Sequence, residues 1–332
     1  MALLEVEDLV VEFRSDYGDV RASDRVSFTV DKGEVVGLVG ESGSGKTVTS
    51  KAILRLVEPE SAIRSGRIRF RDRDVLTLSE EAMRDLRASE IAMVFQDPMT
   101  ALNPVLRIGD QLTRVYLEHA RGDASTSPGG RKALLASTRE RAMELLRTVR
   151  IPDPEVRFGQ YPHQFSGGMR QRVMIAMALM CRPSLLIADE PTTALDATVE
   201  LQVIELIKEL QRKFQVSVLF ISHNLGVIAK LCDRVVVMYA GRVLESAPTV
   251  ELFSRPQHPY TRALIGSLAR GTKAEKLLKP IRGEPPHLVG LPAGCPFRPR
   301  CDLAVEACVE AQPLRPLGSS HLVACHRAPT PG

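Results

Sequence analysis

Tryptophan is absent from the 332 residues of this chain, and aromatic residues make up only 5% of them. Long apolar runs are missing too: VMIAMALM at 173–180 falls far short of the roughly 18–20 residues that a membrane span needs. The N-terminus, MALLEVEDLVVEF, lacks the basic residues and the plain apolar core of a signal peptide. These absences predict a cytoplasmic protein that meets a membrane only through a partner.

An excess of one sign of charge is missing as well. Lys and Arg number 44 against 40 Asp and Glu, so the formal net charge is only +4. A balance this even gives no argument for a nucleic-acid partner, and we expect none. The hydrophobic fraction of 44% and the charged fraction of 25% are ordinary for a soluble globular protein, and the length allows one large domain and a small one.

Short apolar runs alternate with helical patterns over residues 1–250. The runs typical of buried parallel strands are EVVGLV at 34–39, IAMVF at 91–95, SLLIAD at 184–189, SVLFIS at 217–222 and RVVVMY at 234–239. The helical patterns cover 105–119, 131–149, 167–181, 197–213 and 224–231. LEVEDLVVEF at 4–13 and RVSFTV at 25–30 are typical of β-rich edge material. This alternation predicts an α/β fold with a parallel sheet covered by helices.

The composition changes after about residue 250. Proline becomes frequent, strand patterns disappear, and four of the six cysteines occur there. We therefore predict a boundary near residue 255, with one domain at 1–254 and a second at 255–332.

The octapeptide GESGSGKT fits the pattern G-x-x-x-x-G-K-[ST] and lies between a strand pattern and a helix pattern. Glycines let backbone N–H groups curl around phosphate oxygens, and the helix that follows points its positive end at the anion. Lys46 would supply charge to the β- and γ-phosphates, and the Thr47 hydroxyl could ligate Mg²⁺. A chance glycine-rich turn is the alternative, and the strand–loop–helix context disfavours it. The predicted phosphate-binding residues are Gly40, Ser42, Gly43, Ser44, Gly45, Lys46 and Thr47.

A second strand pattern, in LLIADEPTTALD at 185–196, ends in two carboxylates. Side chains alternate along a strand, so Asp189 and Glu190 should point differently. Asp189 could then serve Mg²⁺ while Glu190 faces an attacking water, which is the division that phosphoryl transfer to water needs. A solvated strand end is the alternative, disfavoured here by the phosphate loop upstream.

Five motifs follow one another in a fixed order: GESGSGKT, VFQDP at 94–98, FSGGMRQR at 165–172, LLIADEPTTALD and SHN at 222–224. In this order they resemble the ATP-binding-cassette (ABC) ATPases over about residues 1–250. The resemblance implies an ABC-type P-loop NTPase domain, with a mixed sheet, a β-rich N-terminal subdomain and a helical subdomain. It also implies hydrolysis of ATP with Mg²⁺.

The resemblance also assigns roles to single residues. Gln96 would contact Mg²⁺ and the membrane partner, Glu190 would be the catalytic base, and His223 would reach the γ-phosphate. Asp196 would lie in a loop between two copies of the cassette. Tyr17 resembles the aromatic residue that stacks on adenine, although an aromatic residue in a β-rich region more often packs in a core.

FSGGMRQR offers a second anion site. Ser166 is a favoured helix N-cap, and Gly167 and Gly168 expose backbone N–H groups at the helix start. The resemblance implies that this stretch faces the phosphate loop of another subunit, with ATP between the two. An ordinary capped helix is the alternative. Met169 stands where Gln is commoner, which points to one subgroup of the family.

That subgroup is indicated by RPQHPYTRALIGSL at 255–268, RGEPPHL at 282–288 and LPAGCPFRPRC at 291–301. These stretches resemble the C-terminal extension of ATP-binding subunits of oligopeptide/dipeptide importers, although nickel importers carry related tails. The resemblance implies peptide uptake, driven from the cytoplasmic face of the membrane. The partners would be a second ATP-binding subunit (a paralogue or a second copy), two transmembrane permeases and an extracytoplasmic solute-binding protein. A soluble, non-transport ABC ATPase is the rival, disfavoured because such proteins usually carry two cassettes or a long coiled coil.

Four cysteines in the last forty residues could hold a metal centre, because four thiolates can ligate a [4Fe–4S] cluster or Zn²⁺. No CxxC pair occurs, which weakens the zinc reading, and a reducing cytosol disfavours disulfides. We rank the iron–sulfur cluster first, zinc second and free thiols third. The four are Cys295, Cys301, Cys308 and Cys325, whereas Cys181 and Cys232 are expected to be packing residues.

Overall fold

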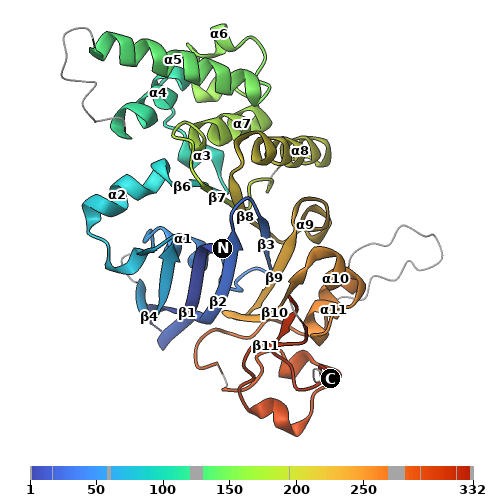
Figure 1. Cartoon of the computed structure of the whole chain (residues 1–332). Helices are drawn as coiled ribbons and strands as arrows, with labels where there is room; N and C mark the ends of the chain where they lie inside the picture. Colours follow the sequence, from blue (N-terminus) through green and yellow to red (C-terminus); the bar gives the residue numbers. More distant parts are fainter. Residues whose placement is uncertain are drawn as a thin grey trace. The chain divides into compact units, whose positions relative to one another are not determined.

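The computed structural model describes residues 2–16, 18–57, 61–119, 130–193, 195–267, 281–291, 293–318 and 320–329 (Figure 1). The chain divides into two compact units. Unit 1 comprises Met1–Thr77 and Leu219–Gly332, and unit 2 comprises Leu78–Val218. The division at residues 254 and 255 stays a prediction.

A four-stranded antiparallel sheet forms the N-terminal part of unit 1. Its strand order is β2-β1-β4-β5, with β1 at Ala2–Ser15, β2 at Gly18–Asp31, β4 at Ser61–Phe70 and β5 at Arg73–Asp74. β1 is buried at Leu4, Leu9 and Val11, and its register with β2 shifts at several points. The stretch expected at a sheet edge therefore lies between two other strands.

The second set of strands in unit 1 runs in the order β11-β12-β10-β9-β3-β8. These strands are β3 (Val35–Val39), β8 (Ser217–Ser222), β9 (Arg234–Tyr239), β10 (Arg242–Pro248), β11 (Arg315–Pro316) and β12 (Leu322–Val323). β3 pairs with β9 in parallel, and β10 pairs antiparallel with both β9 and β12. We expected no strands in the C-terminal region, yet β11 and β12 lie there and extend this sheet.

Short helices accompany these strands in unit 1. They are α1 (Lys46–Ile53), α9 (Leu225–Leu231), α10 (Thr249–Ser254) and α11 (Pro259–Gly266), with 3-10 turns at Val75–Thr77 (η1), Arg298–Arg300 (η4) and Glu306–Val309 (η5). In Figure 1 the C-terminal segments, drawn in red, lie beside β10. The C-terminal region is thus part of the compact unit that holds β3 and α1.

Unit 2 is mainly helical. β6 (Ile91–Val94) pairs in parallel with β7 (Leu185–Asp189). The helices are α2 (Glu80–Ser89), α3 (Pro98–Ala101), α4 (Ile108–His119), α5 (Gly130–Thr148), α6 (Pro154–Arg157), α7 (Gly167–Ala178) and α8 (Ala197–Phe214), with a 3-10 turn at Pro162–Gln164 (η3). On α8, buried Val203, Ile207 and Leu210 recur at the spacing of one helix face. Within the described ranges, no helix combines the length and the hydropathy of a membrane span.

Candidate active site

The phosphate loop follows β3, whose five residues are all buried, and leads into α1. Gly45 is the N-cap of α1 and has a φ of 95°, in the left-handed region. A Cβ atom on Gly45 would lie 2.1 Å from the carbonyl oxygen of Ala22, and one on Gly40 would lie 2.1 Å from that of Met238. Glycine is therefore required at both positions by the close approach of neighbouring backbone.

Lys46 points into this loop. Its side chain is 4% exposed, and Nζ donates to the carbonyl oxygens of Gly40 (3.0 Å) and Glu41 (2.9 Å) and to Oγ of Ser44 (3.2 Å). Thr47 lies in the first turn of α1. A buried ammonium, a glycine-rich loop and a helix N-terminus together make a site that suits a phosphate group.

The base of the loop is fixed by the neighbouring strands. The N–H of Gly241, in the turn between β9 and β10, donates to the carbonyl oxygen of Ser44 at 3.1 Å. Behind the loop, the hydroxyls of Ser23 and Thr49 are hydrogen-bonded at 2.9 Å and buried. The loop thus rests on both sets of strands of unit 1.

His223 follows β8 and is exposed. Its neighbours are held in place, because Oγ of Ser222 accepts from the N–H of Asn224 and the Asn224 side chain caps α9. Strand β8 is next to β3 in the sheet order. Tyr17, the predicted adenine-stacking residue, lies outside the described residues.

Unit 2 brings together the two carboxylates and Gln96. Asp189 ends β7 and is 3% exposed, while Glu190 follows it with a φ of 46°. Oε2 of Glu190 accepts from Oγ1 of Thr193 at 2.9 Å and lies 3.5 Å from Nε2 of Gln96. A left-handed conformation at a residue other than glycine costs about 1–3 kcal/mol and is typical of functional sites. The backbone turn at Glu190 gives the two carboxylates different surroundings.

The FSGG stretch is a capped helix start. Oγ of Ser166 accepts from the N–H of Met169 at 3.3 Å, so Ser166 is the N-cap of α7 as its residue type predicted. A Cβ atom on Gly168 would lie 2.6 Å from Cγ1 of Val199 on α8. Asp196 caps α8 through the N–H groups of Thr198 and Val199. Gly168 therefore has a packing role in addition to exposing its backbone.

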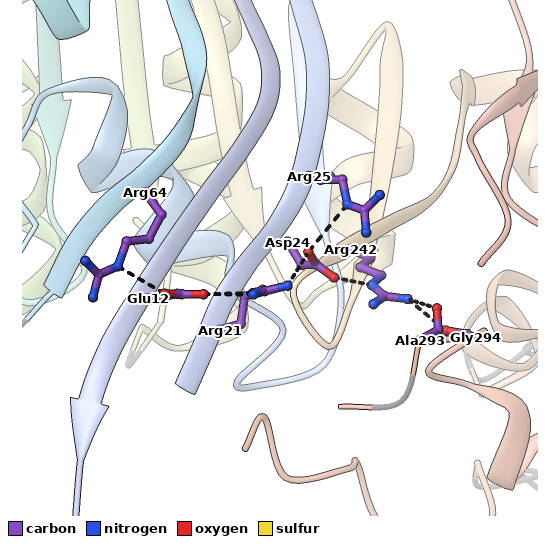
Figure 2. A network of polar contacts seen from close by, with 8 residues as sticks. All are labelled: Glu12, Arg21, Asp24, Arg25, Arg64, Arg242, Ala293 and Gly294. Carbon is purple, nitrogen blue, oxygen red and sulfur yellow. Dashed lines mark hydrogen bonds and ion pairs between the residues drawn. The ribbon is translucent and has the colours of Figure 1, made fainter. Parts of the chain in front are cut away.

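Sequence reasoning missed a group of residues that hold the phosphate loop from outside. The Glu41 carboxylate forms a bidentate ion pair with Arg300, and the Glu41 N–H donates to Oη of Tyr260 at 3.0 Å. Arg242 pairs with buried Asp24 at 2.6 Å (Figure 2). No local pattern in the sequence links Arg300 to Glu41, because the two residues are 259 positions apart.

Two family models match this chain, one after the other along the sequence. The model described as ABC transporter matches residues 23–193. The model described as oligopeptide/dipeptide transporter, C-terminal region, matches residues 244–308.

Full-length relatives agree with these matches. The chain is 48% identical to the dipeptide transport ATP-binding protein DppD of Bacillus subtilis, over 97% of this chain and 94% of the relative. It is 46% identical to the oligopeptide transport ATP-binding protein OppD of Salmonella typhimurium, over 98% of this chain and 93% of the relative. The chain belongs to the ABC transporter family.

The same fold is found in solved ABC structures. One, titled as the dimeric structure of MJ0796, a bacterial ABC transporter cassette, superposes with a TM-score of 0.63 at 26% identity, over 74% of this chain and 98% of that one. A post-hydrolysis state of MJ0796 bound to ADP and phosphate gives a TM-score of 0.64 at 24% identity, with the same coverage. The predicted ABC-type ATPase fold and the predicted family are therefore confirmed.

The prediction of a metal centre at the four C-terminal cysteines has to be corrected. Cys295, Cys301, Cys308 and Cys325 do line one cavity, together with His258 and His326. Within the described ranges, no group of three or more His, Cys, Asp or Glu side chains is placed to hold a metal. The prediction of an iron–sulfur cluster is wrong, and the zinc alternative falls with it.

The reason lies in the arrangement of the side chains, which form no metal-ligand group within the described residues. Burial raises the pKa of the Cys295 thiol to about 11, and it also raises the pKa of Cys301. In the metal-free protein these two thiols are therefore protonated at neutral pH. Cys325 packs in a small apolar cluster with Val323 and Ala328. All six cysteines lie in described ranges, and none is in a disulfide.

Proposed function

We propose that this chain is the ATP-binding and ATP-hydrolysing subunit of an ABC importer that takes up peptides, acting at the cytoplasmic face of the membrane. The observation that carries the proposal is the phosphate loop, in which a buried Lys46 ammonium bonds to Gly40, Glu41 and Ser44. The peptide specificity is supported by relatives named as dipeptide and oligopeptide transport proteins. The C-terminal match to the oligopeptide/dipeptide transporter region supports it further.

The nucleotide site is proposed to combine the phosphate loop with Tyr17 on the adenine and His223 near the γ-phosphate. Thr47, Gln96 and Asp189 have the oxygen ligands that suit Mg²⁺, which neutralises phosphate charge when bound. The proposed site residues are Tyr17, Gly40, Ser42, Gly43, Ser44, Gly45, Lys46, Thr47, Gln96, Ser166, Gly167, Gly168, Asp189, Glu190 and His223.

Glu190 is proposed to act as the general base. Its carboxylate would orient a water and accept one of its protons, while the water oxygen bonds to the γ-phosphorus and the bond from that phosphorus to ADP breaks. The hydrogen bond from Thr193 and the nearby Gln96 amide would keep the carboxylate in one orientation. Lys46 would meanwhile stabilise the negative charge that develops on the phosphate oxygens.

ATP is proposed to close a dimer. In it, the Ser166–Gly168 stretch of a second ATP-binding subunit would face the phosphate loop of this one, and hydrolysis would open the pair again. The related cassette MJ0796 has a structure titled as dimeric. Residues 1–254 would form the cassette and residues 255–332 an accessory extension. Two permease subunits and an extracytoplasmic solute-binding protein would complete the importer.

Glu190→Gln tests this mechanism. The variant keeps the size of the side chain but removes the base, so we expect MgATP binding close to wild type and a kcat for ATP hydrolysis lower by about 10²–10⁴-fold. Calorimetry with MgATP and phosphate-release kinetics measure the two quantities. Glu205→Gln, at an exposed position of α8, is the matched control and should behave as wild type.

Two outcomes would contradict the proposal. If Glu190→Gln hydrolysed ATP as fast as wild type, another group would be the base. If the variant, mixed with its partner subunit and excess MgATP, ran as a monomer in size-exclusion chromatography, ATP would not close a dimer. Uptake of labelled dipeptides by vesicles that carry the reconstituted importer tests the solute.

A further inference from the structure

The guanidinium of Arg300, in the C-terminal region, binds the Glu41 side chain of the phosphate loop. Nη1 and Nη2 donate to Oε2 and Oε1 of Glu41 at 2.7 and 3.2 Å, and Nη1 also donates to Oη of Tyr239 at 3.0 Å. The other donor bonds, to the carbonyl oxygens of Arg282 (2.8 Å) and Ile281 (3.4 Å), fix the guanidinium from behind. The Arg300 side chain is only 6% exposed. A bidentate pair of this kind is geometrically specific and stronger than a single hydrogen bond.

A second contact holds the backbone at the same point. Oη of Tyr260, on α11, accepts from the N–H of Glu41 at 3.0 Å, and the Tyr260 side chain is fully buried. Its ring packs against Tyr239 and Phe297, with centroids 4.6 and 5.3 Å away. The side chain and the backbone N–H of Glu41 are therefore both held by residues beyond position 254, with Tyr239 as the shared support.

The C-terminal region is also attached to Arg242, which follows the turn between β9 and β10 (Figure 2). Nε of Arg242 bonds to Oδ2 of Asp24 at 2.6 Å, and its Nη1 donates to the carbonyl oxygen of Gly294 at 2.7 Å. The residue before it, Gly241, donates its N–H to Ser44 of the loop. Asp24 is 3% exposed and also pairs with Arg21. The C-terminal segment is thus bonded to Glu41 of the loop through Arg300, and through Gly294 to Arg242, the neighbour of the residue that bonds Ser44.

Glu41 is directly connected to the lysine of the loop. It is the second residue of GESGSGKT, and its carbonyl oxygen accepts from Nζ of Lys46 at 2.9 Å. Any rotation of the Glu41 backbone would therefore move an acceptor of the ammonium and the N–H groups that follow. A further segment, with Pro285, Pro286 and Leu288, lines a cavity together with Glu41 and Ser42.

We infer that Arg300 is a positioning residue for nucleotide binding, and that through it the C-terminal region tunes the affinity of the phosphate loop for MgATP. The inference rests on the proposed ATP site. If the ion pair keeps the loop in its binding-competent conformation, its loss lets the loop populate other conformations, and the apparent dissociation constant rises by the inverse of the competent fraction. A competent fraction near 10% would weaken MgATP binding by about 10-fold. Bound nucleotide then restores the loop, so kcat should change little.

The test compares Arg300→Ala, Glu41→Ala and the double variant in the full-length chain. Calorimetry gives the dissociation constant of MgATP, and hydrolysis of MgATP by the assembled importer gives KM and kcat. We expect the dissociation constant and KM to rise by about 10-fold in each single variant. The double variant should bind MgATP no more weakly than either single variant, because the two substitutions remove the same interaction. Arg300→Lys should recover only part of the loss, because an ammonium cannot make the bidentate contact.

Arg234→Ala is the matched control. Arg234 makes a comparable bidentate pair with Glu34, at 2.8 and 3.0 Å, in the same unit. It lies at the first residue of β9, which runs parallel to β3, whereas the phosphate loop follows the last residue of β3. Its loss should lower thermal stability without changing the affinity for MgATP.

The outcomes separate the possible failures. Arg300→Ala binding MgATP as tightly as wild type, or no more weakly than Arg234→Ala, would overturn the inference, and so would additive losses in the double variant. If Arg300→Ala does not fold, Glu41→Gln decides, because it keeps the side-chain volume and removes the charge. A wild-type chain that does not bind MgATP would refute the proposed function itself.

Discussion

His321 precedes the C-terminal strand β12 and bonds to two carboxylates in unit 1. We predict how much its replacement lowers the stability of β12. Nε2 lies 2.8 Å from Oε1 of Glu245 and Nδ1 lies 2.8 Å from Oε1 of Glu251. His321 is 3% exposed and Glu245 is fully buried, whereas Glu251 is 43% exposed. The hydrogen bond to Glu245, and then that to Glu251, raises the pKa of His321 against the opposing effect of burial.

The two carboxylates should differ in what they contribute. Removing one partner of a buried ion pair costs about 3–5 kcal/mol, whereas a pair with an exposed carboxylate is worth less than about 1 kcal/mol. In His321→Ala, the Glu245 carboxylate still accepts from the N–H groups of Gln257 (2.7 Å) and His258 (2.8 Å), so its charge is not left without hydrogen bonds. We therefore expect the loss of stability in this variant to lie at the lower end of the range, about 3 kcal/mol. Glu251→Ala should cost less than about 1 kcal/mol.

Amide hydrogen exchange at Ala324 measures this locally. Its N–H donates to the carbonyl oxygen of Leu244 at 2.8 Å, so the amide exchanges only when β12 separates from β10. A loss of 3 kcal/mol corresponds to exchange faster by more than about 100-fold after correction for intrinsic rates. Glu251→Ala is the control, with an increase below about 6-fold.

The stabilisation by His321 should depend on pH in one direction. The pKa of His321 is raised in the folded state, so its contribution is fully present below the unfolded value of about 6.5 and is lost as the pH rises through the folded pKa. The difference between wild type and His321→Ala should therefore shrink as the pH rises above about 6.5 and through the raised pKa of His321. His258, whose pKa burial lowers to about 4, titrates below this window. A difference that stayed constant or grew with pH would refute this reasoning.

Two further predictions concern glycines. Gly45→Ala would place a Cβ atom 2.1 Å from the Ala22 carbonyl oxygen at a φ of 95°, so we expect MgATP binding to weaken by more than about 10-fold, by calorimetry, with the circular dichroism spectrum retained. Gly109→Ala would place a Cβ atom 2.1 Å from Cε1 of Phe158, so overpacking should lower the free energy of unfolding of unit 2 by about 1–3 kcal/mol, by urea titration. Gly266→Ala is the control for both, because a Cβ atom there would have nothing within 4 Å. Unchanged MgATP binding in Gly45→Ala would contradict the first prediction, and an unchanged urea midpoint in Gly109→Ala would contradict the second.

Local sequence patterns predicted the regular elements because their signals lie within a few residues of one another. The expected helices at 105–119 and 197–213 correspond to α4 and α8, and the five apolar runs correspond to β3, β6, β7, β8 and β9. The N-cap at Ser166 was also predictable, because a serine before two glycines and a helical pattern indicates a cap. Periodicity could not predict the two-residue strands β11 and β12, because they are too short to show a pattern. They form by pairing, β12 with β10 and β11 with β12.

The predicted metal centre shows where composition misleads. Four cysteines in a short segment suggested ligands, and their spacing could not reveal how the side chains are arranged in space. That arrangement is a property of the packed chain, and within the described residues it gives no group that could hold a metal.

The sequence by itself determined that this chain is an ABC ATPase with a glycine-rich phosphate loop, because that chemistry depends on residues adjacent in the chain. Only the tertiary structure decided that the C-terminal region holds this loop through Arg300 and Glu41. These two residues are 259 positions apart, and a contact over such a separation leaves no periodic or local trace in one sequence. It forms because folding places the loop, β9 and the C-terminal segment in one compact unit.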